Sequence, residues 1–140
     1  MKISGVILSG GNDIGEFESR DITERYLLDY AFKTKKPLLG ICRGMQLMAT
    51  WAGCGLKKVE NHAATYHKIE FNEKILEVNS YHNYAINFCP KNFSVLAKSP
   101  DNEIEAIRHN YLNWEGWMWH PEREKIFTKF DLKNLRKIFN

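Results

Sequence analysis

The chain has 140 residues, of which 44% are hydrophobic and 26% are charged, and its formal net charge is +3. This length and composition fit one globular domain over residues 1–140 and exclude a disordered, collagen-like or disulfide-dense protein. No apolar run approaches the ~20 residues that cross a bilayer, and the first residues show no signal-peptide pattern, so a cytoplasmic protein without membrane contact is expected.

Short apolar strands and helices alternate in the first part of the chain. Residues 3–9 predict a buried strand, and residues 20–33 predict a helix in which the early Glu24 suits the helix dipole. The continuous apolar run at 37–42 predicts a parallel strand that is covered on both faces. Residues 43–53 have the apolar spacing of a second helix, so this part of the chain is of the α/β class.

The second half of the chain is rich in predicted strands. The segments at 66–71, 74–78, 93–99 and 103–109 have strand-type sequences and are separated by turn-forming residues. The segment WEGWMWHPER at 114–123 predicts a last aromatic strand that ends at a His-Pro pair.

Positive charge is concentrated at the C-terminus. Residues 123–140 hold six Lys/Arg and two acidic residues, a net +4, whereas the rest of the chain has 14 basic and 15 acidic residues. Apolar residues recur through this segment at near-helical spacing, which predicts a docked terminal helix with a solvated basic face. Since nothing else in the chain is strongly basic, a nucleic-acid partner is not expected.

The run Gly40-Ile41-Cys42-Arg43-Gly44 lies between a predicted strand and a predicted helix. In this context it predicts a nucleophile elbow, in which the central residue takes a strained backbone conformation and the flanking glycines leave room for it. The helix N-terminus is expected to lower the pKa of the Cys42 thiol. A buried structural cysteine in a glycine-rich turn is the alternative.

Two other cysteines, Cys54 and Cys89, lack this context and are expected to be packing residues. A sparse set of three cysteines with no CxxC pair argues against a disulfide framework and against a zinc site of that kind.

A nucleophilic cysteine requires a base, and the base requires an orienting group. His120 follows the last predicted strand and Glu122 lies two residues beyond it, so both side chains can lie on one side of the strand end. The carboxylate would then hold the imidazole in the tautomer that accepts the thiol proton. Cys42, His120 and Glu122 are therefore the predicted catalytic residues, and a plain surface histidine is the alternative.

Acyl chemistry at Cys42 creates an oxyanion that requires fixed hydrogen-bond donors. The backbone N–H of Arg43, the residue after the nucleophile, is one expected donor. Gly11 first and Gly10 second are expected to supply the other, because residues without side chains let backbone N–H groups approach a ligand. A plain Gly-Gly turn is the alternative.

In this order, Gly10-Gly11, GICRG and WHPE resemble the class I glutamine amidotransferase-like superfamily. Within it, GICRGMQ, EVNSYHNYAI at 77–86, SPDNEIEAIRH at 99–109 and RDITE at 20–24 resemble the γ-glutamyl-γ-aminobutyrate hydrolase group of cysteine peptidases. The chain also resembles the γ-glutamyl-CDP-amidate hydrolases of capsule-building bacteria. The resemblance implies a flavodoxin-like, doubly wound, mostly parallel sheet with a nucleophile elbow, a β-rich second half and a C-terminal helix.

The resemblance also implies a reaction. The cysteine attacks a γ-glutamyl amide, an amine leaves, and water hydrolyses the thioester to glutamate, with the histidine carrying protons and no cofactor required. The resemblance places Gln46, Ser80, Tyr81 and His82 at the pocket for the glutamyl group.

His62 and His67 have a spacing that suits a metal pair on a helix. Their segment is predicted as loop and strand, so no metal is expected.

The leaving group and the partners stay open at this level. The amine could be small, such as γ-aminobutyrate, or a nucleotide amidate whose phosphate would meet Arg43 or Arg123, although both more commonly form structural ion pairs. The expected partners are a small-molecule γ-glutamyl substrate and either a second copy of the chain or a synthetase, since a glutaminase component of a two-part enzyme shares the triad. An inactive binding protein is the other alternative, because the family has further elements before the Gly-Gly strand and the domain therefore resembles an N-terminally truncated one.

Overall fold

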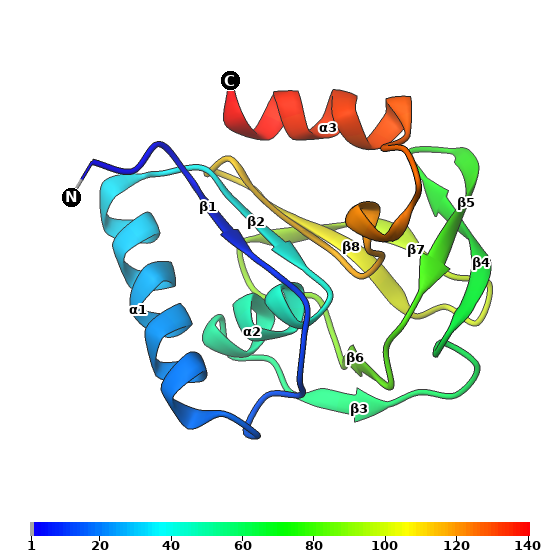
Figure 1. The fold of residues 1–140 in the computed structure, drawn as a ribbon, viewed down its shortest axis with the longest axis horizontal. Coiled ribbons are helices and arrows are strands. Elements are labelled where there is room, and N and C mark those ends of the chain that lie inside the picture. The colour runs from blue at the N-terminus through cyan, green and yellow to red at the C-terminus, as the bar shows by residue number, and fades with distance from the viewer. Residues whose placement is uncertain (1) are drawn as a thin grey trace.

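In the computed structural model, which describes residues 2–140, a seven-stranded sheet carries helices on both faces (Figure 1). The strand order is β1-β2-β9-β8-β7-β4-β5. The parallel pairings join β1 (Val6–Leu8), β2 (Leu38–Ile41) and β9 (Trp114–Trp117). The antiparallel strands are β4 (Thr65–Phe71), β5 (Lys74–Ser80), β7 (Phe93–Lys98) and β8 (Ile104–His109). The α/β class is confirmed, and the sheet is mixed.

Helices α1 (Glu18–Thr34) and α2 (Arg43–Trp51) cover one face of the sheet, and α3 (Lys129–Phe139) crosses the other (Figure 1). Helix α2 lies against β9 so closely that a Cβ on Gly116 would come within 2.7 Å of the Met45 side chain. On the opposite face, Phe130 of α3 meets Phe71 of β4 edge to face, with ring centroids 4.9 Å apart. Strand β2 is buried along its whole length, as its continuous apolar sequence predicts.

Helix α1 leaves much of its apolar side in solvent. Ile22 and Tyr26 are 61% and 65% exposed, while the buried positions are Glu24, Leu28 and Ala31. The side chain of Glu24 lies on the buried side of α1, where its carboxylate forms an ion pair with the buried Arg43 at the start of α2. An ion pair between the helices, and not apolar periodicity alone, therefore decides which side of α1 faces the core.

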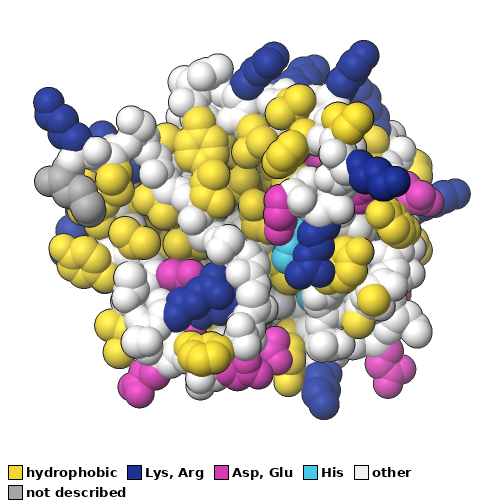
Figure 2. All heavy atoms as spheres, in the orientation of Figure 1, with side chains coloured by type: hydrophobic (Ala, Val, Ile, Leu, Met, Phe, Trp, Pro, Cys, Tyr) yellow, Lys and Arg dark blue, Asp and Glu magenta, His cyan; other side chains and the backbone are white. Residues whose placement is uncertain are grey.

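The predicted terminal helix is confirmed. Thr128 caps α3 by accepting a hydrogen bond from the backbone N–H of Asp131, and Ile138 is buried in the core. Lys and Arg side chains project into solvent at the edge of the molecule where α3 lies (Figure 2). This is the solvated basic face that the charge pattern predicts.

A small second sheet was not predicted. It pairs β3 (Leu56–Lys58) with β6 (Tyr84–Ile86) in antiparallel fashion. Each strand has only three residues, too few for alternation to be recognised in the sequence. Strand β6 directly follows the segment that holds Tyr81 and His82, so this pairing helps to position that segment.

Within residues 2–140, no helix combines the length and the apolar character required to cross a bilayer.

Candidate active site

The turn between β2 and α2 has the geometry of a nucleophile elbow. Cys42 has φ 52° and ψ −104°, a conformation that residues with a side chain rarely adopt, and its N–H donates to the carbonyl of Trp117 at 2.7 Å. A Cβ on Gly44 would lie 2.0 Å from the Leu8 carbonyl oxygen, and one on Gly40 would lie 2.6 Å from the backbone of Gly44. Both glycines are therefore required for the close approach of β1, β2 and α2.

Burial controls the acidity of the Cys42 thiol. Desolvation raises its pKa to about 11, and the hydrogen bond from the backbone N–H of Arg43 and the charge of Arg123 only partly oppose this. The helix N-terminus does lower this pKa through the Arg43 N–H, but the net lowering that the sequence suggested is wrong, because desolvation has the larger effect. The resting group is a thiol, so nucleophilic attack requires a base.

His120, the predicted base, lies at the sheet edge where the elbow is found. It follows β9, which pairs with β2 so that Ile41 lies opposite Trp117, and Cys42 and His120 therefore leave the sheet at the same edge. The Nδ1 atom of His120 lies 2.6 Å from Glu122 Oε1. A carboxylate accepts a hydrogen bond, so the proton lies on Nδ1 and Nε2 keeps a lone pair.

Asn79 holds the backbone of His120 from both sides. Its Nδ2 donates to the His120 carbonyl at 2.8 Å, and its Oδ1 accepts from the His120 N–H at 2.8 Å. Asn79 lies within the segment EVNSYHNYAI, but the resemblance of that segment implied no role for it. The sequence feature that could have indicated this role is an amide residue directly after a predicted strand. At that place its side chain can hydrogen-bond the backbone at the end of a neighbouring strand.

The Gly-Gly turn lies against the imidazole. A Cβ on Gly10 would lie 2.4 Å from His120 Cε1, so this position must lack a side chain. Arg20 Nη2 donates to the carbonyl of Gly10 at 2.9 Å. In a trans peptide the next N–H points the opposite way, so the N–H of Gly11 points away from Arg20.

A cavity of about 200 Å³ adjoins the elbow, lined by Gly11, Cys42, Gln46, Tyr81 and His82 among others. Gln46 Nε2 donates to the Tyr84 carbonyl at 3.0 Å, which holds α2 to the segment before β6. Of the four residues predicted at the pocket, three line this cavity: Gln46, Tyr81 and His82. The fourth, Ser80, does not. It is fully buried, and its Oγ donates to the His62 carbonyl at 2.5 Å.

The two arginines that were considered for phosphate binding differ. The Arg43 guanidinium is buried and paired with Asp21 and Glu24, so it is a structural cation and is not free for a ligand. The Arg123 guanidinium lies over the ring of Tyr81, 4.2 Å from its centroid. Arg43 also lines the cavity, but its guanidinium is engaged in these ion pairs, whereas the Arg123 guanidinium lies beside the lining residue Tyr81.

Sequence reasoning missed a cluster next to this cavity. His62, His67 and His82 surround the buried carboxylate of Glu105 in β8. The spacing of the first two histidines suggested only a helical pair, but the fold brings them together from a loop and a strand. The one available signal was an acidic residue inside the otherwise apolar run IEAI.

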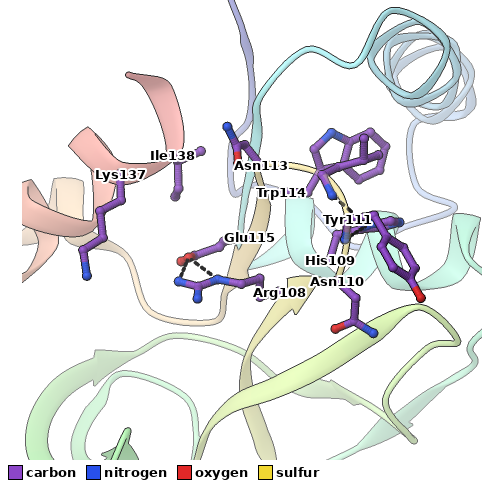
Figure 3. Close-up of a pocket in the computed structure, with 10 residues that line it drawn as sticks. Arg108, His109, Asn110, Tyr111, Asn113, Trp114, Glu115, Lys137 and Ile138 are labelled. Carbon is purple, nitrogen blue, oxygen red and sulfur yellow. Dashed lines mark hydrogen bonds and ion pairs between the residues drawn. The ribbon is translucent and has the colours of Figure 1, made fainter.

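A second hollow, of about 360 Å³, lies at the opposite end of β9 and is drawn in Figure 3. Its charged groups satisfy each other, since Arg108 donates to Glu115 Oε1 from Nε at 3.0 Å and from Nη2 at 2.6 Å. His109 Nδ1 accepts the N–H groups of Tyr111 and Leu112. No cysteine lines this hollow, so the chemistry is expected at the elbow.

Comparisons with known proteins point to one family. The glutamine amidotransferase class-I family matches residues 1–139. A γ-glutamyl-CDP-amidate hydrolase of Campylobacter jejuni is 39% identical over 128 residues, which are 87% of this chain and 64% of that protein. A glutamine-hydrolysing GMP synthase component of Methanococcus aeolicus is 32% identical over 147 residues, which cover 98% of this chain and 74% of that protein.

Solved structures show the same fold. A protein from Thermoplasma acidophilum that is assigned as a GMP synthase component superposes with a TM-score of 0.82 at 23% identity, covering 98% of this chain and 71% of that chain. A glutamine amidotransferase from Thermotoga maritima gives a TM-score of 0.74 at 21% identity, covering 96% and 60%. The present chain spans somewhat less than two thirds of the C. jejuni relative's length.

Proposed function

This chain belongs to the glutamine amidotransferase class-I family, and we propose that it is a cysteine-dependent hydrolase of γ-glutamyl amides. One observation carries the proposal: Cys42 has the strained conformation of a nucleophile elbow at the sheet edge where the hydrogen-bonded pair of His120 and Glu122 lies. The C. jejuni relative, named as a hydrolase of a γ-glutamyl amide, supports it.

In the proposed reaction, the Nε2 atom of His120 accepts the proton of the Cys42 thiol as Sγ attacks the γ-carbonyl carbon. Since the thiol has a pKa of about 11, proton transfer and attack are coupled, and no standing thiolate is required. The imidazolium then protonates the leaving amine as the C–N bond breaks. Water, deprotonated by the same imidazole, hydrolyses the thioester and releases glutamate and the thiol.

The oxyanion of each tetrahedral intermediate requires two donors. The backbone N–H of Arg43 already points at the Cys42 sulfur, which is the position expected of one donor. The N–H of Gly11, at the wall of the same cavity, is the proposed second donor. The role of Gly10 is then to leave room for His120.

The rest of the cavity suits a glutamyl group. Asp13 and Glu16 are among its lining residues and supply negative charge that matches the α-ammonium of the substrate. Gln46 and His82 line the same cavity, and both hydrogen-bond the carbonyl of Tyr84, so their positions are fixed before substrate arrives.

For the leaving group, we favour a nucleotide amidate. The C. jejuni relative is named for such a substrate, and the cationic Arg123 over the aromatic face of Tyr81 is a suitable contact for a phosphate and a base. The second candidate function is a glutaminase component that supplies ammonia to a synthetase, because several similar proteins are glutamine-hydrolysing components of GMP synthase.

The test is glutamate release from glutamine, γ-glutamyl-γ-aminobutyrate and a γ-glutamyl nucleotide amidate. Wild-type protein is compared with Cys42→Ala and with Cys54→Ala, a matched control that removes another buried thiol. We expect release that Cys42→Ala abolishes and Cys54→Ala retains. Activity that depends on an added synthetase and uses glutamine supports the glutaminase component instead. Release that persists in Cys42→Ala, or silence of the folded protein in all conditions, would overturn both proposals.

A further inference from the structure

Three histidines surround one buried glutamate beside the active-site cavity. The carboxylate of Glu105 lies 3.2 Å from His62 Nδ1, 3.5 Å from His67 Nε2 and 3.5 Å from His82 Nε2. The side chains of His62, His82 and Glu105 are no more than 2% exposed, and that of His67 is 13% exposed. The four residues come from separate segments: the loop before β4, β4 itself, the β5–β6 connection and β8.

In these histidines one ring nitrogen, here called inner, faces Glu105, and the other, called outer, faces away from it. The hydrogen bond of the outer nitrogen determines whether the inner nitrogen carries a proton or a lone pair. His62 Nε2 lies 2.7 Å from Asp101 Oδ2, and His82 Nδ1 lies 2.9 Å from the carbonyl oxygen of Tyr84. Carboxylate and carbonyl oxygens only accept hydrogen bonds, so each neutral imidazole carries its proton on that outer nitrogen. In the neutral form, which a metal ligand requires, the inner nitrogens of His62 and His82 therefore direct lone pairs at the carboxylate of Glu105.

This arrangement leaves the centre of the cluster unsatisfied. Within the described part of the chain, the three inner nitrogens and both Glu105 oxygens are buried and have no aligned hydrogen-bond partner. Nitrogen lone pairs that face a carboxylate are repelled by its negative charge. Buried polar atoms normally have hydrogen-bond partners. A divalent cation between them would take the three nitrogens and a carboxylate oxygen as ligands.

We propose that His62, His67, His82 and Glu105 bind a zinc ion. Three imidazoles and one carboxylate are a donor set that zinc accepts, and adjacent ligand atoms of a tetrahedral zinc site are separated by about 3.3 Å. His62 and His82 lie 3.2 and 3.5 Å from Oε1 of Glu105, and His67 lies 3.5 Å from Oε2, so these separations are close to that value. The ligand atoms of His62, His67 and Glu105 lie within 4.8 Å of one another, and His82 is the fourth proposed ligand.

The surroundings of the cluster match those of metal sites. Metal-bound histidines usually donate their second N–H to a carboxylate or a backbone carbonyl, as His62 and His82 do here. The charges also balance, since Zn²⁺ would meet two carboxylates, Glu105 as a ligand and Asp101 behind His62.

Four protein ligands fill a tetrahedral site, so this zinc would be structural. It would tie the segment after β5 to β4 and β8. That segment holds His82 and Tyr81, which line the active-site cavity, and Tyr81 lies edge-on to the ring of His120 at 5.8 Å. The ion would therefore fix one wall of the cavity without touching the reacting atoms.

The test uses tag-free, metal-free Cys42→Ala protein, because the active-site thiol is the rival metal ligand. Cobalt(II) is the probe, since tetrahedral coordination gives intense visible absorption, and zinc is then added to displace it. We expect one equivalent of cobalt to bind. Adding His67→Gln or Glu105→Gln should lower the affinity by more than 100-fold, whereas the control His109→Gln, which removes a histidine outside the cluster, should retain it.

Asp101→Asn adds a finer test. It keeps all four ligands but weakens the acceptor behind His62, so we expect the same absorption spectrum with an affinity ~10–100-fold lower. Zinc should also raise the midpoint of thermal unfolding of the Cys42→Ala protein and not that of the Glu105→Gln variant.

Two results would overturn the proposal. The first is that the metal-free Cys42→Ala protein binds no stoichiometric cobalt or zinc at neutral pH. The cluster would then be stabilised by ion pairs between protonated histidine and Glu105. This agrees with the pKa of His62, which the neighbouring Glu105 and Asp101 raise to about 9 against the opposing effect of burial. The second is equal binding in the Cys42→Ala protein and its His67→Gln derivative. If a cluster variant fails to fold, the titration of the Cys42→Ala protein alone decides.

Discussion

Substitution of Gly10 by alanine tests the catalytic arrangement through a single added methyl group. The new Cβ would lie 2.4 Å from His120 Cε1 and 3.2 Å from Nδ1, whereas ordinary contact begins near 3.4 Å. The ring and the turn must therefore separate by about 1.0 Å. Gly10 does not have a left-handed φ, so alanine is acceptable to the backbone itself and the clash with the imidazole is the main effect.

The displaced group is the proposed base. A misplacement of about 1 Å in a catalytic group costs on the order of 100-fold in rate, and overpacking a buried contact costs about 1–3 kcal/mol of stability. His120 cannot follow freely, because Asn79 holds its backbone and Glu122 its Nδ1 atom. We therefore expect Gly10→Ala to fold and to lose about 100-fold in kcat/KM for glutamate release.

The matched control is Gly15→Ala. Gly15 has φ +96°, and nothing lies within 4 Å of a Cβ built there, so this variant adds backbone strain without a contact to the site. It should lose stability but keep the activity of its folded fraction. Urea unfolding gives the stability of both variants, and steady-state glutamate release gives the rates. Activity of Gly10→Ala within about threefold of wild type would refute the assigned position of the base.

Three further tests use contacts of the same region. Because burial raises the pKa of Cys42 to about 11, its alkylation by iodoacetamide should increase about tenfold per pH unit from pH 7 to 10, and a plateau below pH 8 would contradict this. Asn79→Ala should lower the free energy of unfolding by about 1–3 kcal/mol in urea titrations and reduce kcat, since it leaves the buried N–H of His120 unpaired and leaves its C=O with the Arg123 N–H as backbone donor; unchanged stability would show that water replaces the amide. Arg43→Met should cost about 3–5 kcal/mol, because Asp21 and the buried Glu24 lose their shared cation and Glu24 keeps only Arg20. Neutralising Glu24 with Glu24→Gln should recover part of the loss; purely additive effects would refute the coupling.

The differences between expectation and structure share a cause. Ser80 was expected at the pocket because it precedes Tyr81 and His82, but successive residues at a strand end point to different sides, and Ser80 is turned inward to the His62 carbonyl. For Arg43 the sequence favoured a structural ion pair over a phosphate contact, and the structure shows the ion pair, but nothing local indicates that α1 supplies Asp21 and Glu24 as the partners. In both cases the deciding neighbours lie far away in the sequence.

The local features of this protein follow from its sequence alone. Gly40, Cys42 and Gly44 between an apolar strand and a helix specify the elbow, because a strained turn requires small flanking residues wherever it occurs. The spacing of His120 and Glu122 specifies their hydrogen bond, since a single residue separates them and that residue is a proline, which directs the turn. Such features depend on steric limits to the backbone over a few residues, and the residue types at those positions determine these limits.

The electrostatics, in contrast, depend on the folded arrangement. Whether Cys42 is a thiol or a thiolate depends on how much water its neighbours exclude, and burial outweighs the hydrogen bond from the Arg43 N–H. The assembly of His62, His67 and His82 around Glu105 depends on packing segments that span more than 40 residues. Desolvation and charge pairing act through space, so they are determined when the chain has folded and not by the order of its residues.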